Sequence, residues 1–515
     1  MTPSPLDARL DRRGFLAATI AGGFALAGCS PRTPAPATPA PPAPTPSGLS
    51  AAIANAEAAR PHTGRTVTAS LTPQPATIDL GGPTPRTLAY GATIPAPVIR
   101  ANVGDELAVT VTNRLDHPTS VHWHGITIRN DMDGASPATP TIEAGKEFTY
   151  RFSVPDAGTY WAHPHTELDA DFGMYVPVIV DDPRDPGAYD AEWIVVLDDW
   201  TDGVGKTPQQ IFDTLHAGMP GMGGMPGMSG MPGMGGMPGM GGVGTSSLLG
   251  GDAGDVAYPY YLINGRIPAA PTTFTAKPGQ RIRIRIINAG SDTAFRVALP
   301  GHTMTVTHTD GYPVQPTPVD ALLLGMGERY DVLVTAADGI FPLVALAEGK
   351  NAVARALLAT GAGTPPDAAF QPAELTKRVG TVEMFTATPQ ADLGNAAADV
   401  NLAAVLAGDM MHYNWTINGA PFGKNEPLQI SQGQRAVLTF TNNTMMWHPM
   451  HLHGHTFQIV KPDGSHGARK DTTIVLPRQK LAVALVADNP GIWMLHCHNT
   501  YHQSAGMMTS LNYRP

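Results

Sequence analysis

The placement of histidine constrains this chain more than any other sequence feature. Among its 18 histidines, the pattern His-x-His occurs five times, where random placement predicts roughly one occurrence. Residues i and i+2 of a β-strand point to the same face, so each pair offers two imidazoles to one space. The pairs fall into an early group, residues 122–165, and a late group, residues 451–498. The sequence therefore predicts strands that present metal-binding histidines.

Cys497 narrows the choice of metal. Imidazole alone suits copper, zinc, iron and nickel, whereas one thiolate with two imidazoles and a distant thioether is the blue-copper ligand set. His502 follows Cys497 by five residues and Met507 by ten, and His448 can supply the other imidazole. In an extended segment, the two histidines that flank Cys497 must point to the opposite face. One tripeptide would then connect a single-metal site to a second metal cluster.

The rest of the sequence favours an all-β fold. The chain holds 50 prolines and 56 glycines between valine- and threonine-rich runs, which is typical of many short strands. Residues 107–112 and 281–286 alternate with the strand period. A turn, a strand and an asparagine recur in the same order, ending at Asn113, Asn288 and Asn442. This recurrence indicates one β-sandwich domain that is repeated three times.

The length of 515 residues also suggests roughly three domains. A net charge of −10 gives no indication of nucleic-acid binding. The predicted segments are an export signal with a lipobox-like end at 1–29, a proline-rich tether and short helix at 30–60, and domains at 61–183, 184–360 and 361–515.

Four ordered motifs carry the candidate ligands: His122-Trp123-His124-Gly125, His163-Pro164-His165, His448-Pro449-Met450-His451-Leu452-His453-Gly454 and His496-Cys497-His498-Asn499-Thr500-Tyr501-His502. They resemble the copper motifs of three-domain multicopper oxidases, over essentially the whole chain after the leader. Within that family the resemblance is greatest to bacterial copper-tolerance oxidases that oxidise cuprous ion. It implies three cupredoxin-like Greek-key β-sandwiches, with a copper cluster between the first and the third.

The resemblance implies four copper ions and a ligand set for each. Type 1 copper would take His448, Cys497, His502 and axial Met507, because the family's spacing favours Met507 over Met508. Type 2 copper would take His122 and His451. The two type 3 ions would take His124, His163 and His498, and His165, His453 and His496. His455 and His308 are expected to pack or to contact ligands rather than to bind metal.

The implied reaction is the four-electron reduction of O2 to water by a donor that gives one electron at a time. His496, Cys497 and His498 would relay each electron from type 1 copper to the cluster. By the same resemblance, Asp133, nine residues after His124, relays protons. The alternative for Asp133 is a turn-forming Asp-Gly pair.

A methionine-rich segment suggests the substrate. Eight methionines recur at every third position, separated by glycine, proline and one serine, so the segment cannot pack a core. Thioethers are soft ligands that suit Cu(I), and we expect the segment to capture it and pass it towards type 1 copper by way of Met446. An ordinary flexible loop is the alternative. The methionines are Met219, Met222, Met225, Met228, Met231, Met234, Met237 and Met240.

Two positions depart from the copper-tolerance pattern. Thr444 stands where those oxidases have a carboxylate four residues before the type 1 histidine, and Gln503 stands where some relatives have an acid. The sequence therefore leaves other functions open. These are a laccase-like phenol oxidase, a ferroxidase, a non-catalytic copper-sequestering lipoprotein and, less favoured, a copper nitrite reductase.

The leader predicts export. Arg12 and Arg13 precede an apolar stretch that is too short to span a bilayer, in the layout of a twin-arginine signal. Leu26-Ala27-Gly28-Cys29 resembles a lipobox, and eight prolines lie within residues 31–46. We therefore expect an exported, periplasmic or cell-surface monomer that is tethered to the membrane through lipidated Cys29. Simple cleavage of the signal without a lipid is the alternative. Processing would leave Cys497 without an intrachain disulfide partner.

Overall fold

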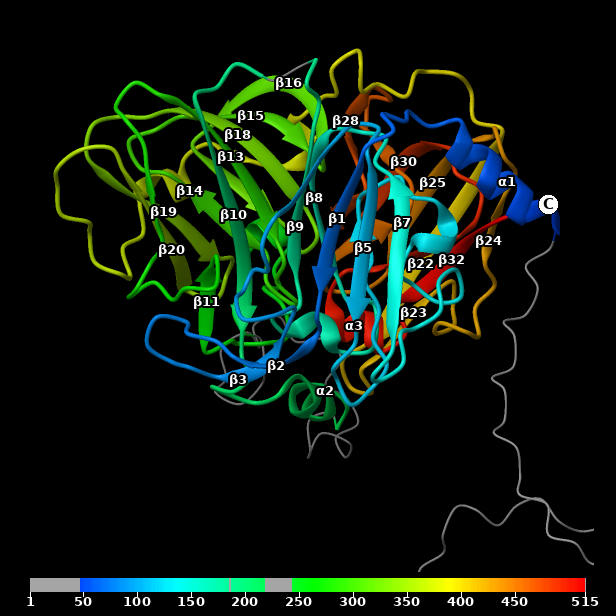
Figure 1. The fold of residues 1–515 in the computed structure, drawn as a ribbon, viewed down its shortest axis with the longest axis horizontal. Coiled ribbons are helices and arrows are strands. Elements are labelled where there is room, and N and C mark those ends of the chain that lie inside the picture. Colours follow the sequence, from blue (N-terminus) through cyan, green and yellow to red (C-terminus); the bar gives the residue numbers. More distant parts are fainter. Residues whose placement is uncertain (1–46, 185–186, 218–242, 515) are drawn as a thin grey trace, which may run out of the picture. The chain divides into compact units, whose positions relative to one another are not determined.

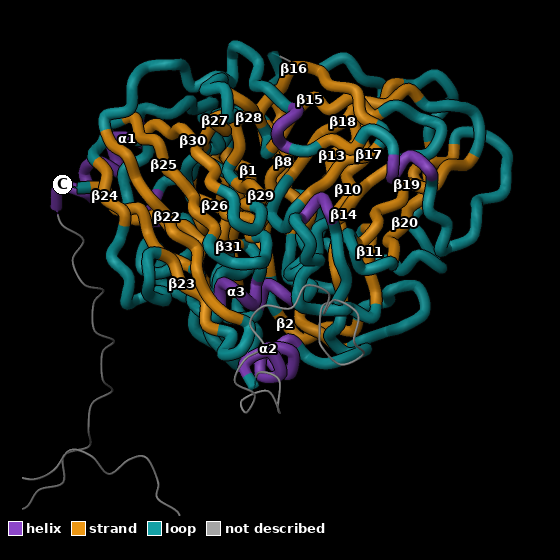
Figure 2. Tube along the Cα trace, turned by 180° about the vertical axis from the view of Figure 1, so that it is seen from behind, coloured by secondary structure: helices purple, strands orange, loops and turns teal. Residues whose placement is uncertain are grey.

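The computed structural model describes residues 47–184, 187–217 and 243–514. The predicted leader, the proline-rich tether and the methionine-rich segment lie outside the described residues. Within the described part, no helix is long and apolar enough to cross a membrane. Strands dominate there, and the tube view in Figure 2 shows them connected by loops and a few short helices.

The N-terminal part forms two facing sheets (Figure 1). Side chains from both sheets belong to one buried core. One sheet contains, in spatial order, β1 (Thr66–Leu71), β5 (Glu106–Thr112) and β7 (Glu147–Ser153). The other contains β4 (Ile99–Asn102), β9 (Val176–Asp181), β8 (Gly158–His163) and β6 (His122–His124). A separate hairpin joins β2 (Gln74–Thr77) to β3 (Arg86–Ala89).

The middle part repeats this arrangement with two larger sheets. One contains, in order, β11 (Tyr260–Ile263), β10 (Ala191–Trp200), β13 (Arg281–Asn288), β18 (Arg329–Thr335), β15 (Met304–Thr309) and β16 (Tyr312–Val319). The other contains β12 (Thr273–Thr275), β20 (Ala352–Ala359), β19 (Ile340–Ala347), β14 (Phe295–Ala298), β17 (Ala321–Leu324) and β21 (Val379–Gly380).

The C-terminal part repeats it once more. One sheet contains β23 (Asn414–Ile417), β22 (Val400–Asp409), β25 (Arg435–Asn442), β30 (Lys480–Val486), β27 (Phe457–Val460) and β28 (His466–Lys470). The other contains β24 (Leu428–Ile430), β32 (Met508–Tyr513), β31 (Ile492–Cys497), β26 (His448–Leu452) and β29 (Thr472–Val475).

Strand pairing shows that the three parts share one topology. The first long strand of each part pairs in parallel with the strand that leads into the recurring asparagine, as β1–β5, β10–β13 and β22–β25. That second strand pairs antiparallel with β7, β18 or β30. A second parallel pair, β4–β9, β12–β20 or β24–β32, occurs in the facing sheet. The fold is therefore all-β, with one arrangement of facing sheets used three times.

The recurring asparagine stabilises the same turn in each part. Nδ2 of Asn113 donates to the carbonyl of His117, 2.9 Å away, and to the carbonyl of Ile142, 2.8 Å away. Its Oδ1 accepts from an amide two residues later. The equivalent side chains of Asn288 and Asn442 make the same kinds of bond. Buried turn groups need such partners, which explains why an asparagine stands at the start of the turn after each strand.

Short helices occupy the junctions between these parts. In α1 (Ser47–Ala58), Oε1 of Glu57 accepts from the amide and the hydroxyl of Ser153, both at 2.9 Å. A Thr207–Gln210 capping box begins α2 (Pro208–His216). The side chain of Asn499 caps α3 (Thr500–Ser504). In both Figures 1 and 2, α2 and α3 lie at the same end of the strands.

Candidate metal centre

Cys497 lies in a buried group of three ligand atoms. Its Sγ is 3.7 Å from Nδ1 of His448 and 3.7 Å from Nδ1 of His502, and the two Nδ1 atoms are 3.1 Å apart. All three side chains are fully buried. Each therefore points a single ligand atom at one space, which suits a copper ion held by a thiolate and two imidazoles.

The local chain geometry explains this convergence. Cys497 is the last residue of β31, and the capped helix α3 returns His502 towards it. The amide of Cys497 donates to the carbonyl of Met507, and the amide of Met507 donates to the carbonyl of His502, both at 3.0 Å. The Met507 side chain is fully buried, whereas Met508 lines a surface cavity. Met507 is therefore better placed than Met508 for the predicted axial role.

The Nε2 atoms of His448 and His502, which face away from Cys497, have different partners. Nε2 of His448 lies 2.9 Å from Oγ1 of Thr444, the residue that replaces the family's carboxylate. Nε2 of His502 lies 2.9 Å from Oδ2 of Asp255, which also accepts from the Tyr413 hydroxyl at 2.7 Å. Burial lowers the pKa of His502, but the hydrogen bonds and charges of Asp255 and Cys497 together outweigh burial and raise it to about 10.

Asp255 is a site residue that sequence reasoning missed. It lies in no histidine motif and is 247 positions from His502, so only the three-dimensional contact identifies it. A surface cavity of about 360 Å³ between α2 and residues 255–259 reaches Asp255. Met446, predicted as a last step for substrate copper, is buried at 4 % exposure, while its neighbour Met445 is 66 % exposed.

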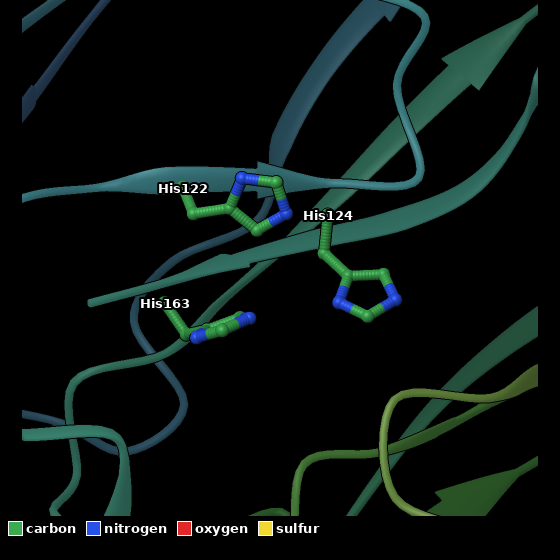
Figure 3. Close-up of side chains that lie close together, drawn as sticks. All are labelled: His122, His124 and His163. Carbon is green, nitrogen blue, oxygen red and sulfur yellow. The ribbon is translucent and has the colours of Figure 1, made fainter. Parts of the chain in front are cut away.

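The remaining eight predicted ligands form a second group. Facing nitrogens lie 3.3 Å apart in His122–His451, 3.3 Å in His165–His496, 3.0 Å in His453–His496 and 3.2 Å in His124–His498. The ring centres of His163 and His498 are 5.1 Å apart. Figure 3 shows His122, His124 and His163 gathered close together. The early and late histidine motifs thus meet in one cluster.

Hydrogen bonds on the outer side of the rings aim the inner nitrogens at the cluster. Nδ1 of His122 lies 2.9 Å from the carbonyl of Asp133, and Nδ1 of His453 lies 2.8 Å from Oδ2 of the same residue. Nδ1 of His163 and Nδ1 of His496 bond carbonyls of their own segments at 2.8 and 2.9 Å. Such contacts fix the tautomer and orientation of metal-ligating histidines.

The ring nitrogens that face the cluster are in a state that can bind a metal ion. Nε2 of His163 is buried and has no hydrogen-bond partner among the described residues, so its lone pair is available to bind a metal ion. Burial and neighbouring imidazoles hold the pKa of His163, His453 and His496 well below the usual range. Neutral imidazole is the form that binds metal, so this donor set fits the copper ions that the motifs imply.

His124 is oriented differently from the others. Its Nδ1 faces His498, while its Nε2 lies 3.1 Å from Oδ1 of Asp471. Burial raises the pKa of Asp471, but the Arg329 guanidinium outweighs burial and holds it well below the usual range. Arg329 donates to both Asp471 oxygens, at 2.7 and 2.6 Å. An ion pair between β18 and the start of β29 therefore sets the orientation of His124.

Gly125 and Gly327 let the backbone approach these groups. A Cβ at Gly125 would lie 2.1 Å from Nη2 of Arg329, and one at Gly327 would lie 2.8 Å from Cε1 of His124. Both glycines have positive φ, +84° in each case. The glycine after the first His-x-His motif is thus required by the packing of the Arg329 pair.

The strand β31 connects the two groups as the sequence predicts. Cys497 faces His448 and His502, while His496 faces His165 and His453, and His498 faces His124. Alternation along β31 produces the division between His496 and Cys497, and His498 lies just beyond the end of this strand. The two groups are therefore joined by the backbone of a single tripeptide.

Three further positions that the sequence singled out lie outside the two ligand groups. Nε2 of His455 bonds the Tyr513 hydroxyl at 2.7 Å, and His308 contacts Thr307 and Arg283, so both pack as expected and lie outside the ligand groups. Gln503 lines a surface cavity of about 340 Å³ together with His165 and Glu167. The cavity gives the histidine cluster a route towards the surface.

Comparison with known proteins identifies relatives along the whole chain. Family models described as multicopper oxidase match residues 73–185, 191–363 and 396–515. The multicopper oxidase MmcO of Mycobacterium tuberculosis is 65 % identical over 98 % of this chain and 97 % of its own length. Copper resistance protein A of Escherichia coli is 27 % identical over 80 % of this chain and 87 % of its own length.

Solved structures show the same fold. A laccase from Botrytis aclada superposes with a TM-score of 0.68 at 25 % identity, covering 89 % of this chain and 90 % of its own. Fet3p, a multicopper oxidase that functions in iron import, superposes with a TM-score of 0.72 at 20 % identity, covering 88 % and 91 %. These likenesses confirm the predicted all-β fold of cupredoxin-like sandwiches.

Proposed function

The chain belongs to the multicopper oxidase family, and from that premise we propose that its physiological donor is Cu(I), which it oxidises to Cu(II) while O2 is reduced to water. The observation that carries the oxidase reaction is the joining of the Cys497 group to the histidine cluster by the His496-Cys497-His498 tripeptide. A protein that only sequesters copper has no use for such a connection.

We assign the ligands by the contacts described above, with four copper ions in all. As the resemblance of the motifs implies, one ion would be held by His448, Cys497, His502 and Met507, one by His122 and His451, one by His124, His163 and His498, and one by His165, His453 and His496. When bound, copper supplies one-electron redox chemistry at the Cys497 group and the four electrons that O2 needs at the cluster.

The chain's own residues have three tasks. Cys497 and its two flanking histidines provide the covalent path between the sites. Asp133 holds His453 through Oδ2, and its Oδ1 is buried without a hydrogen-bond partner among the described residues. We therefore assign Asp133 the delivery of protons to the cluster. Asp471 and Arg329 keep His124 in the orientation that turns Nδ1 inward.

Two features support Cu(I) as the donor. The eight methionines of residues 219–240 supply soft ligands, and the chain is similar to copper resistance protein A over most of its length. Asp255 favours a second candidate, Fe(II), because a carboxylate beside His502 suits a harder cation. A phenol oxidase would need the 360 Å³ cavity beside Asp255 to admit an organic ring.

Oxygen uptake with Cu(I), Fe(II) and a phenol as alternative donors tests the substrate. We expect the highest kcat/KM with Cu(I); a higher value with either other donor would replace this proposal. Metal analysis and an absorption spectrum test the core, with four coppers and an intense blue band expected. Cys497→Ser should abolish both the blue band and oxygen consumption, because no other thiolate lies in the described site. Uptake at the original rate would refute the assignment.

We also propose that the protein is exported and lipid-anchored through Cys29 as a monomer, on the strength of its leader sequence. Cys29→Ala should move it from the membrane fraction to the soluble exported fraction. Unchanged membrane association would refute the proposal that lipidated Cys29 is the anchor.

A further inference from the structure

The hairpin between β22 and β23 presents two methionines to solvent. At its tip, Met410 is 42 % exposed and Met411 is 65 % exposed. A methionine side chain stabilises the fold by burial, and here it gains little of that free energy. What the two side chains do offer is a pair of thioether sulfurs, which are soft metal ligands.

A histidine beside them is held in the manner of a metal ligand. Oδ1 of Asp409 lies 3.0 Å from Nδ1 of His412 and accepts from the His412 amide at 2.8 Å. The imidazole is 76 % exposed. A carboxylate on one ring nitrogen places the proton there and leaves the other nitrogen free to bind metal. Its Nε2 is therefore a third ligand atom on the same turn.

The next residue connects this turn to the Cys497 group. The ring of Tyr413 is fully buried, and its hydroxyl donates to Asp255 at 2.7 Å. Asp255 in turn bonds Nε2 of His502 at 2.9 Å. On the same strand, the Trp415 ring packs 4.2 Å from the His502 ring. The hairpin thus extends from the surface to the outer side of the type 1 site.

The C-terminal end of α2, which belongs to the middle part of the chain, lies beside Tyr413. The centres of the His216 and Tyr413 rings are 5.6 Å apart, so a second imidazole lies beside the residue that connects the hairpin to Asp255. The region from Met410 to Asp255 therefore passes from soft sulfur ligands through imidazole to a harder carboxylate. Cuprous ion favours the first and cupric ion accepts the last, whereas Fe(II) has little affinity for thioethers.

We propose that Met410, Met411 and His412 form a surface site that binds Cu(I) and passes it towards Asp255. This site is separate from the type 1, 2 and 3 ligands and uses only residues of the hairpin. The proposal rests on Cu(I) being the donor, and it names where the donor first binds.

Silver titration tests binding without turnover, because Ag(I) is a soft, redox-inert stand-in for Cu(I). The copper-loaded, full-length protein is labelled with carbon-13 at the methionine methyl groups, and the Met410 and Met411 signals are assigned with Met410→Leu and Met411→Leu. Both signals should shift at low Ag(I), and His412→Ala should raise the Ag(I) concentration needed. Met384, 38 % exposed on another part of the surface, is the matched control and should not shift at that concentration. Shifts confined to other methionines would overturn the proposal.

Kinetics give an independent measurement. The double variant Met410→Leu/Met411→Leu should raise KM for Cu(I) severalfold, with a smaller effect on phenol oxidation, while Met384→Leu should change neither. An unchanged KM for Cu(I) in the double variant would overturn the site. If the unaltered enzyme consumes no oxygen with Cu(I), the proposed function fails instead, and the silver titration still decides whether the hairpin binds a soft cation.

Discussion

Nε2 of His502 and Oδ2 of Asp255 lie 2.9 Å apart and join the C-terminal sheets to a loop of the middle sheets. Both side chains are almost completely buried, at 1 % and 2 % exposure. Since the other nitrogen of His502 faces Cys497, this contact is the most direct link between the candidate copper ligands and the cavity beside α2.

Replacing the carboxylate should therefore affect metal donors most. Asp255→Asn should lower kcat/KM for Cu(I) by about 10- to 100-fold, because it removes both the contact that holds His502 and a carboxylate that the incoming cation can use. Phenol oxidation, which needs no carboxylate for a cation, should fall less. Oxygen uptake with the two donors measures the difference, with Asp213→Asn on the exposed face of α2 as the control. Equal losses for both donors would show that Asp255 acts only on the type 1 site.

Proton delivery should depend on Asp133. Asp133→Asn keeps the side-chain shape but cannot exchange a proton, so oxygen reduction should slow by about 100-fold or more. The blue band should persist, because Asp133 contacts His122 and His453 but none of the type 1 ligands. Stopped-flow reoxidation measures the rate of oxygen reduction, and the visible spectrum shows whether the blue band persists. Asp131→Asn, which removes only a surface partner of Arg129, is the control, and unchanged turnover in Asp133→Asn would refute the relay.

Deleting residues 219–240 tests the methionine-rich segment. The deletion should weaken Cu(I) oxidation more than phenol oxidation, because soft thioethers capture Cu(I) and give a phenol no advantage. Steady-state oxygen uptake with each donor measures the two losses of activity. A segment of equal length in which all eight methionines are replaced by leucine separates ligand loss from loop shortening. An equal effect on both donors would argue for a plain connecting loop.

Removing Arg329 should destabilise the protein strongly. Arg329→Met leaves the Asp471 carboxylate charged and unpaired in the interior, which costs about 3–5 kcal/mol of unfolding free energy. Arg378→Met is the matched control, since its pair with Asp320 is 46 % exposed on the arginine side and contributes about 1 kcal/mol or less. Calorimetry of the two copper-loaded variants compares them, and equal melting temperatures would contradict the role of the buried pair.

Stability should also fall in acid through Asp105. Burial raises the pKa of this carboxyl, but hydrogen bonds from Arg65 and Thr63 outweigh burial and lower it to about 2. Because the unfolded carboxyl titrates near 3.8, the unfolded chain binds more protons, and about 2 kcal/mol of stability is lost as pH falls from about 5 to about 2.

Unfolding of the unaltered protein and of Asp105→Asn at pH 7 and at pH 3 measures this contribution. The difference between the two proteins should shrink at pH 3, and loss of copper in acid affects both alike. The exposed Glu143→Gln serves as the control. A difference that is constant with pH would assign the effect of Asp105 to packing.

Much of the fold could be predicted because its signals are local. The Arg-Ile alternation of residues 281–286 places Ile282, Ile284 and Ile286 in the core, as the strand period requires. Arg285 breaks the pattern, since it is buried and pairs with Glu192 and Asp331. Its burial depends on acids from two other strands, which no local pattern reveals.

By itself the sequence determined the three-fold repeat, the ligand types and the two faces of the Cys497 strand, because residue chemistry and strand alternation act over a few neighbouring positions. Tertiary structure alone decided which distant groups meet at the site: Asp255 with His502, Arg329 with Asp471, and Tyr413 with Asp255. Arg329 and Asp471 are 142 positions apart, and burial makes such pairs mandatory once the sheets meet. Each of these residues needs a partner because burying its polar or charged group is costly, but the packing of the sheets determines which residue becomes the partner.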